Sequence, residues 1–392
     1  MRLPDLAVPF RGDRFTAADR LSRLIAPPYD VISASQRAAF AAQDAHNIVH
    51  VMLPEAPSGD RYAYAAKQLG QWRDDGTLGR DPESSVYVLA QDFVLPTGER
   101  RTRVGVFVAL AAEGYESRRV RPHEHTHAGP KADRLALLRA TQTSLESIFV
   151  IAPDSDGALA RALRDVVAKP PAATAELGGV GIRLWVLAGA AAAAVTALIN
   201  RGPVYMADGH HRYETASTYA TENAKVDRLL TFVVSAKDAG LAILPTHRVI
   251  YGAPVAPEAL AGAWSESFDV AEITSTVVPV GVGWVVVWPV GRAQSLALKP
   301  AVASGMSDFD VIGSGDYVVR SIVQQAGTAQ LVYTPDAKEA IAAMGKGATA
   351  AVLMPAPRLD TVFQVADAQG IMPPKSTYFF PKVPAGMVIF TP

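Results

Sequence analysis

The length and composition of the chain are those of a globular protein with two or three domains. It has 392 residues, of which 49% are hydrophobic and 19% are charged, so it can bury more than one core. Its 37 Lys and Arg nearly balance its 38 Asp and Glu, so no overall positive field attracts it to nucleic acid or to an anionic membrane. The absence of cysteine excludes disulfides, thiolate nucleophiles and zinc–thiolate sites.

No segment of the sequence indicates secretion or membrane insertion. The opening MRLPDLAVPFRGDRF lacks the apolar core of a signal peptide. The most apolar stretch, residues 184–199, is short for a membrane span and is mostly alanine, which favours a helix of a soluble protein. We therefore expect a cytoplasmic protein.

Hydrophobic periodicity, caps and turn residues predict an irregular succession of helices and strands. Ser33 is expected to cap the first helix, and residues 169–181 to form a surface connection. Helices are predicted at residues 33–43, 60–76, 131–142, 156–168, 188–199, 212–223, 256–270, 316–327 and 336–347. Strands are predicted at residues 47–54, 85–95, 101–110, 147–153, 182–187, 202–207, 228–236, 241–250, 282–290, 295–300 and 350–356, and close to residue 392.

This order of elements indicates the α+β class. Helices and strands are mixed along the whole chain, but they do not alternate in the regular βαβ rhythm of a doubly wound parallel sheet. We expect three parts: an N-terminal α+β domain at residues 1–170, a phosphate-binding segment at residues 171–254, and a C-terminal α+β domain at residues 255–392.

The segment DGHHR places an acid, a glycine and three donors at a predicted strand-to-helix turn. Gly209 permits a tight turn, and the first N–H groups of the following helix favour an anion. His210, His211 and Arg212 would surround a phosphate with donors. A metal site that includes Asp208 competes with this interpretation, although adjacent histidines seldom chelate one ion. A capped helix with two structural histidines is the third alternative.

Residues 121–134, RPHEHTHAGPKADR, form the densest cluster of titratable groups. Alternating His and Glu in a loop could ligate a divalent ion, whereas Lys and Arg beside acids fit a charged substrate. A solvated loop before a capped helix is the structural alternative. The residues concerned are His123, Glu124, His125, His127, Lys131, Asp133 and Arg134.

Three shorter motifs also carry groups that could bind or react. PPKSTYFFPK offers Lys375 and Ser376 on a loop stiffened by proline, which suits phosphate, or else packs its aromatic residues on a core. PPYDVI offers a hydroxyl and a carboxylate on a rigid turn. LPTHRV places a histidine and an arginine in a strand, where histidines are more often structural than catalytic. These residues are Tyr29, Asp30, His247 and Arg248.

Together these motifs resemble the domain of unknown function 1015 family. The motifs PPYDVI, HEHT with PKADR, ADGHHRYETA, LPTHR and PPKSTYFFPK occur in that order, and the resemblance covers nearly all of the chain. The family name implies no activity.

The DGHHR turn is also distantly similar to the phosphate-binding helix start of the ParB and sulfiredoxin superfamily, which includes free-serine kinases, CTP-binding partition proteins and sulfinic-acid reductases. This resemblance implies a small α+β nucleotide-binding domain accompanied by further α/β segments. It also implies that His210, His211 and Arg212 hold nucleotide phosphates, and that Asp208 lies beside the transferred group and the metal. Because the chain has no cysteine, the kinase branch fits best.

The preferred hypothesis is a phosphotransferase that uses ATP, ADP or another nucleotide with Mg²⁺ on a small hydroxyl-bearing metabolite such as serine. Its carboxylates would be Asp208, also the metal ligand, with Glu124 and Asp133, and its nucleotide contacts His210, His211, Arg212, Lys375 and Ser376. Its substrate contacts would be Tyr29, Asp30, His123, Lys131, Arg134, His247 and Arg248.

Two other functions remain open: a non-catalytic, ParB-like nucleotide-binding regulator, and a metal-dependent hydrolase that uses the HEHTH loop. The sequence shows no long Lys/Arg cluster, which argues against a nucleic-acid partner. It leaves the oligomeric state open, an oligomer included.

Overall fold

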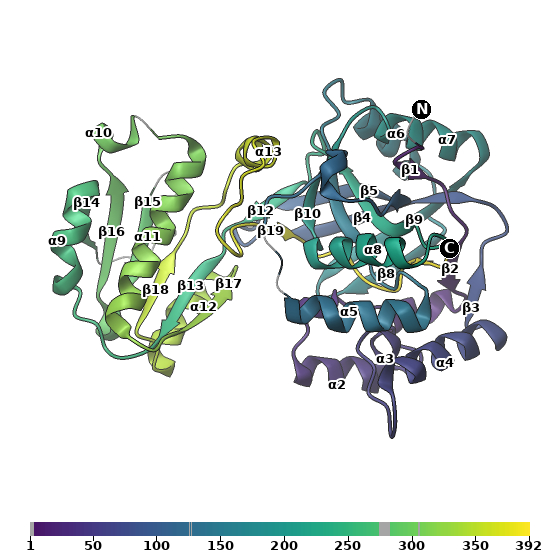
Figure 1. Cartoon of the computed structure of the whole chain (residues 1–392), viewed down its shortest axis with the longest axis horizontal. Coiled ribbons are helices and arrows are strands. Elements are labelled where there is room, and N and C mark those ends of the chain that lie inside the picture. Colours follow the sequence, from purple (N-terminus) through teal and green to yellow (C-terminus); the bar gives the residue numbers. More distant parts are fainter. Residues whose placement is uncertain (1–3, 125, 127, 274–282, 305) are drawn as a thin grey trace. The chain divides into compact units, whose positions relative to one another are not determined.

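The computed structural model of the chain describes residues 4–124, 126, 128–273, 283–304 and 306–392 (Figure 1). It contains two compact units. The first comprises Met1–Pro122, Thr126–Leu241 and Pro381–Pro392, and the second comprises His123–His125 and Ala242–Phe380. In sequence, most of the second unit is therefore an insertion near the end of the first.

A nine-stranded mixed sheet forms the body of the first unit. The strands follow the order β6-β10-β7-β11-β5-β4-β9-β8, and β1 pairs with β5 outside this path. β10 is parallel to β6 and β11 is parallel to β7, whereas the other pairs are antiparallel. The strands are β1 (Ala7–Val8), β4 (Ser85–Val94), β5 (Arg100–Ala111), β6 (Val120–Arg121), β7 (Ile148–Ala152), β8 (Ala173–Leu177), β9 (Val180–Ala188), β10 (Val204–Asp208) and β11 (Arg228–Ser235).

The central strands are buried along almost their whole length. Residues 85–91 of β4 and 103–111 of β5 are all buried, which explains their long apolar runs. Helices α6 (Ala158–Val167) and α7 (Gly189–Ile199) pack on β4, and α8 (His210–Glu222) packs on β7 and β11. Figure 1 shows α8 beside α5 (Ala128–Thr141), and this pair forms the wall that carries the candidate site.

A small antiparallel sheet and a set of short helices complete the first unit. Ser33 caps its helix as predicted, because its hydroxyl accepts from the backbone N–H of Gln36 and the Gln36 side chain accepts from the N–H of Ser33. The small sheet has the order β20-β2-β3. Its strands are β2 (Gly12–Phe15), β3 (Leu78–Arg80) and β20 (Ile389–Phe390), and the helices are α1 (Leu21–Leu24), α2 (Ala34–Gln43), α3 (Val49–Met52) and α4 (Arg61–Asp74), with 3-10 turns η1 (Ala18–Arg20), η2 (Tyr29–Val31) and η3 (Tyr115–Ser117).

The second unit is built on a six-stranded sheet with the order β14-β16-β15-β18-β13-β17, in which all pairs are antiparallel. Its core includes Trp264, Trp284 and Trp288. A short ribbon pairs β12 (Ala242–Leu244) with β19 (Tyr378–Phe380). The other elements are β13 (His247–Tyr251), α9 (Glu258–Ser267), β14 (Phe268–Ile273), β15 (Gly283–Val287), η4 (Pro289–Gly291), β16 (Ala293–Leu298), α10 (Pro300–Ala303), α11 (Asp308–Ala326), β17 (Gln330–Thr334), α12 (Ala337–Ala342), η5 (Ala343–Lys346), β18 (Ala350–Leu353) and α13 (Leu359–Asp367).

The structure confirms the α+β class and corrects several local predictions. Residues 47–54 were expected to form a strand, but they contain α3, because the side chain of Asn47 accepts from the N–H of Val49 and donates to the carbonyls of Arg23 and Ile25. The expected surface connection at 169–181 contains β8, which forms a hairpin with β9. β17 and α13 were not predicted at all.

The compact units also divide the chain at other places than the three parts expected from the sequence. Residues 171–241 do not form a separate segment, because β8, β9, β10 and β11 complete the large sheet of the first unit. The second unit takes over at Ala242 rather than at residue 255, because β13 lies inside its sheet. Within the described residues, no helix combines the length and the apolar character needed to cross a membrane.

Candidate functional site

The DGHHR segment lies where β10 ends and α8 begins. Asp208 is the last residue of β10, and Gly209 has a φ of 91°, in the left-handed region. A Cβ on Gly209 would lie 2.9 Å from Cγ2 of Ile148 and 3.2 Å from its Cα. Glycine is therefore required both by the backbone angle and by the close approach of β7. The predicted strand-to-helix turn is confirmed.

His210, His211 and Arg212 form the first turn of α8. The backbone N–H groups of a first helical turn have no acceptor within the helix, and they carry the positive end of its dipole. The His210 side chain is buried and that of His211 is half-buried. This turn thus presents backbone donors directly after the carboxylate of Asp208.

Asp208 is paired with two cations. Its Oδ2 accepts a hydrogen bond from Nη2 of Arg212 at 2.8 Å, and its Oδ1 accepts one from Nζ of Lys382 at 2.9 Å. The Asp208 side chain keeps 20% of its surface exposed. Each carboxylate oxygen therefore has its own cationic partner, and both cations lie at the end of β10.

Lys382 is held in place through the backbone of its own segment. Gln91 donates to the carbonyl of Lys382 at 3.0 Å, and Nη2 of Arg103 donates to the carbonyl of Pro381 at 2.6 Å. The Arg103 guanidinium also donates to Gln91 and lies over the ring of Phe149, 4.8 Å from its centroid. Two residues of the central strands β4 and β5 thus fix the segment that brings Lys382 to Asp208.

Arg103 is an unusual charge for a sheet interior. Its residue is 0% exposed, and among the described residues its Nε and Nη1 have no hydrogen-bond partner. Burial lowers the pKa of Arg103 to about 9, although Asp238 and Asp208 oppose this change. Burial in turn raises the pKa of Asp238 to about 6.

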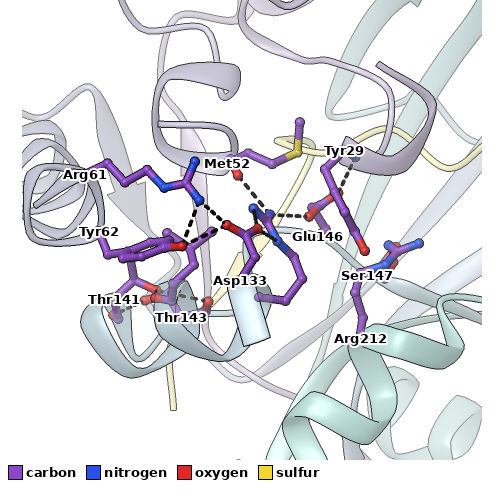
Figure 2. Close-up of polar contacts among 12 residues, drawn as sticks. Tyr29, Met52, Arg61, Tyr62, Asp133, Thr141, Thr143, Glu146, Ser147 and Arg212 are labelled. Atoms are coloured by element: carbon purple, nitrogen blue, oxygen red, sulfur yellow. Dashed lines mark hydrogen bonds and ion pairs between the residues drawn. The ribbon is translucent and has the colours of Figure 1, made fainter. Parts of the chain in front are cut away.

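A second group of charged residues lies beside Arg212 (Figure 2). Nη1 of Arg212 donates to the carbonyl of Ser147, and the N–H of Tyr29 donates to Oε1 of Glu146 at 2.7 Å. The guanidinium of Arg134 lies over the ring of Tyr29, 4.3 Å from its centroid, and its Nη1 is 3.6 Å from Oε2 of Glu146. The PPYDVI motif and the DGHHR turn therefore meet around Glu146.

Burial and neighbouring charges together shift the pKa values of this group. Burial raises the pKa of the Glu146 carboxyl, although Arg212 and Arg134 oppose it. It also raises the pKa of Tyr29 to about 12. Burial lowers the pKa of Arg212, but the nearby carboxylates, above all that of Asp208, outweigh burial and raise the pKa overall. Asp30 contributes to both the Tyr29 and the Arg212 pKa, which places its charge in the same network.

Asp133 and Lys131 take part in structural ion pairs. Oδ2 of Asp133 accepts from Nε and Nη2 of Arg134 at 2.9 and 2.6 Å, and its Oδ1 accepts from Arg61 and Tyr62. Although burial opposes the change, contact with Arg134 lowers the pKa of Asp133. Nζ of Lys131 donates to Glu214 of α8 at 2.8 Å. Both side chains therefore tie α5 to its neighbours.

A pocket of about 60 Å³ lies between α5, α8 and the segment before β7. Its charged lining consists of Arg134, Glu146 and Arg212. The remainder is mainly apolar, with contributions from both helices and from β11. The pocket and the start of α8 share Arg212.

The sequence-predicted residues that the structure describes in the second unit are His123, Glu124, Lys375, Ser376, His247 and Arg248. Nε2 of His123 lies 3.1 Å from the hydroxyl of Thr377, and Ser376 donates to the carbonyl of Pro373 at 2.6 Å. Glu124 and Lys375 belong to the same unit. Lys375 has a φ of 57°.

His247 and Arg248 lie in β13, inside the sheet of the second unit. Nδ1 of His247 accepts from the backbone N–H of Met354 at 3.0 Å, and burial lowers the pKa of His247 to about 4. Arg248 donates to the carbonyl of Pro374 and lies over the ring of Tyr333.

The structure thus gathers part of the predicted site and adds to it. The predicted residues brought together in the first unit are Tyr29, Asp30, Asp133, Arg134, Asp208, His210, His211 and Arg212. Sequence reasoning missed Glu146 and Lys382; Lys382 closes the quoted PPKSTYFFPK motif, but Lys375 was chosen instead. His125 and His127 lie outside the described residues. Within the described part of the chain, no group of three His, Asp or Glu is placed to hold a metal ion.

Comparisons with known proteins give a family and several similar folds. The model of the family described as Protein of unknown function (DUF1015) matches residues 7–365. A search of curated proteins found no match.

Among solved structures, the chain is similar to a mutant free serine kinase in complex with ADP, with 12% identity, a TM-score of 0.39, and coverage of 70% of this chain and 87% of that chain. A conserved hypothetical protein from Pyrococcus furiosus has 13% identity and a TM-score of 0.37, and the match covers 72% of this chain and 93% of that chain. SbnI with a C-terminal truncation, from Staphylococcus aureus, has 12% identity and a TM-score of 0.38, and the match covers 71% of this chain and 84% of that chain.

Proposed function

We propose, given that the chain belongs to the family Protein of unknown function (DUF1015), that it is a nucleotide-dependent phosphotransferase acting on a small hydroxyl-bearing metabolite. The observation that carries this proposal is the start of α8, where Lys382 and Arg212 converge on Asp208 beside the first backbone N–H groups of the helix. The site combines a helix dipole, two cations and a carboxylate, which are components used in phosphoryl transfer.

The first turn of α8 and Lys382 supply the phosphate contacts. The N–H groups after Gly209 favour negative charge, and a Lys amino group binds phosphate as a point charge. A phosphate that approached Lys382 would compete with Asp208 for its amino group, so binding exchanges one anion for another. Arg212 is anchored on the carbonyl of Ser147 as well, and it would keep its position.

In the transfer step, the substrate hydroxyl oxygen forms a bond to the terminal phosphorus of the nucleotide. The bond from that phosphorus to the bridging oxygen breaks, and the nucleotide leaves with one phosphate fewer. The hydroxyl proton passes to a protein carboxylate. Positioning and charge stabilisation supply most of the rate enhancement in such reactions.

The described side chains do not form a site for Mg²⁺ at Asp208. Both oxygens of its carboxylate already accept from cations, and a metal ion would have to displace them. No step of the proposed phosphate transfer therefore involves a metal held by Asp208.

Calorimetric titration with ATP, ADP and CTP tests the first half of the proposal, and ³¹P NMR of ATP with a panel of short alcohols and amino alcohols tests the second. We expect Lys382→Met to weaken nucleotide binding roughly 10- to 100-fold, the equivalent of one charge-assisted hydrogen bond. Lys169→Met is the control, because Lys169 is exposed in the same unit.

If no nucleotide binds, the proposal is wrong. Nucleotide binding without transfer to any alcohol would instead identify a non-catalytic regulator. A parallel Lys375→Met variant shows whether that predicted contact takes part, since Lys375 belongs to the second unit.

A further inference from the structure

The pocket between α5 and α8 has the size of a small metabolite. Each water-sized group needs about 10–15 Å³ on this measure, so a volume of about 60 Å³ holds roughly four to six such groups. Its apolar wall is formed by Leu137, Leu138, Leu145, Ala216 and Leu229. This wall suits a short aliphatic chain.

The charged end of the pocket presents an acceptor rather than a cation. Both arginines there already hold carboxylates: Arg134 binds Asp133 through two nitrogens, and Arg212 binds Asp208. Glu146 is less fully engaged. Its Oε1 accepts from the backbone of Tyr29, but its Oε2 has no hydrogen bond among the described residues.

Among the described residues, the cationic nitrogen nearest to Oε2 of Glu146 is Nη1 of Arg134, at 3.6 Å. That distance is an ion pair without a hydrogen bond. Because Arg134 and Arg212 flank the carboxylate, a ligand ammonium would meet two positive charges. A ligand carboxylate would meet Glu146 itself. A neutral hydroxyl can donate to Oε2 without repulsion from the two arginines or from the Glu146 carboxylate.

We infer that this pocket binds the aliphatic part of a short hydroxyl-bearing substrate, whose hydroxyl donates to Glu146. The inference deepens the proposed phosphotransferase and rests on it for the reaction. Arg212 joins the pocket to the start of α8, since it lines the one and pairs with Asp208 in the other. Glu146 is then the carboxylate that takes the hydroxyl proton while the oxygen bonds to phosphorus and the leaving nucleotide departs.

The environment of Glu146 agrees with this role. Burial raises the pKa of Glu146, which brings a carboxylate closer to the working range of a general base. Asp208 is the alternative base, but its two oxygens are engaged by Arg212 and Lys382.

Saturation-transfer NMR with three probes of equal length tests the pocket without any nucleotide. We expect 1-propanol to give a signal with the wild-type protein, and propylammonium and propionate to give signals at least fivefold weaker. Ala216→Leu extends a side chain into the pocket from α8 and should abolish the 1-propanol signal. Glu222→Gln, at the other end of α8, is the matched control and should leave it unchanged.

Glu146→Gln tests the chemistry separately from the space. It keeps an acceptor oxygen, so 1-propanol binding should fall less than tenfold, whereas the rate of phosphate transfer to an alcohol should fall at least a hundredfold at constant KM for ATP. Circular dichroism and ADP titration check that Ala216→Leu and Glu146→Gln remain folded with an intact nucleotide site.

Preferred binding of propionate, or a 1-propanol signal that survives Ala216→Leu, overturns the inference. A wild-type protein that binds ADP but not 1-propanol also overturns it, and the proposed function then stands alone. If 1-propanol binds as expected and no nucleotide does, the pocket stands and the proposed function fails.

Discussion

Gly209 provides a direct test of the turn on which the candidate site is built. Replacement by Ala requires a φ of 91° from a residue with a Cβ, which costs about 1–2 kcal/mol. The new Cβ would also lie 2.9 Å from Cγ2 and 3.2 Å from Cα of Ile148. Because the backbone of β7 cannot yield easily, overpacking adds about 1–3 kcal/mol. We expect Gly209→Ala to lower the free energy of unfolding of the first unit by about 2–5 kcal/mol.

Gly98 is a closely matched control for this experiment. Its φ is 89°, and a Cβ there would meet nothing within 4 Å. Gly98→Ala should therefore cost only the backbone share, about 1–2 kcal/mol. Urea unfolding followed by circular dichroism measures both variants, and the difference between them isolates the contact with Ile148. Equal losses for the two variants would refute the argument that β7 and the turn must approach closely.

Two further predictions concern other parts of the chain. His247 is 1% exposed and its pKa is lowered to about 4, so the unfolded state binds more protons between the ordinary His pKa of about 6.5 and pH 4. The neutral His247 should therefore contribute about 3 kcal/mol to the free energy of unfolding above pH 6.5, and this contribution should be lost as the pH falls to 4. Urea unfolding of the wild type and of His247→Asn at both pH values measures the loss. An equal pH dependence in the variant would show that His247 is not its source. Ser33→Ala removes one acceptor of the capping box and should cost about 1 kcal/mol in the same assay, whereas Ser58→Ala, at an exposed serine outside this helix, should cost much less.

The sequence predicts well those local features, such as caps and turns, that depend on residues close together in the chain. The cap at Ser33 and the turn at Gly209 follow from residues within one helical turn, and both are present in the structure. Residues 47–54 show the limit of such reasoning. Their apolar pattern fits a strand, but Asn47 bonds to carbonyls more than twenty positions earlier and starts a helix instead.

The candidate site is only partly visible in the sequence because its contacts are long-range. Glu146 meets Tyr29 across 117 positions, and Lys382 meets Asp208 across 174. Nothing in the segment LES marks its glutamate as buried, and nothing in FFPK distinguishes Lys382 from Lys375. Only the sheet topology of the first unit brings these side chains together.

The first unit is interrupted in sequence by most of the second unit, and this affects when the candidate site is completed during synthesis. During synthesis, Asp208 and α8 emerge long before Lys382, because residues 242–380, which form most of the second unit, are made between them. β20 likewise closes the small sheet against β2 only after that unit has been made. The Asp208 carboxylate therefore lacks its lysine partner until residues 242–380 have been made. A nascent chain that stops before residue 381 would carry the turn but lack one of the two cations that act on it.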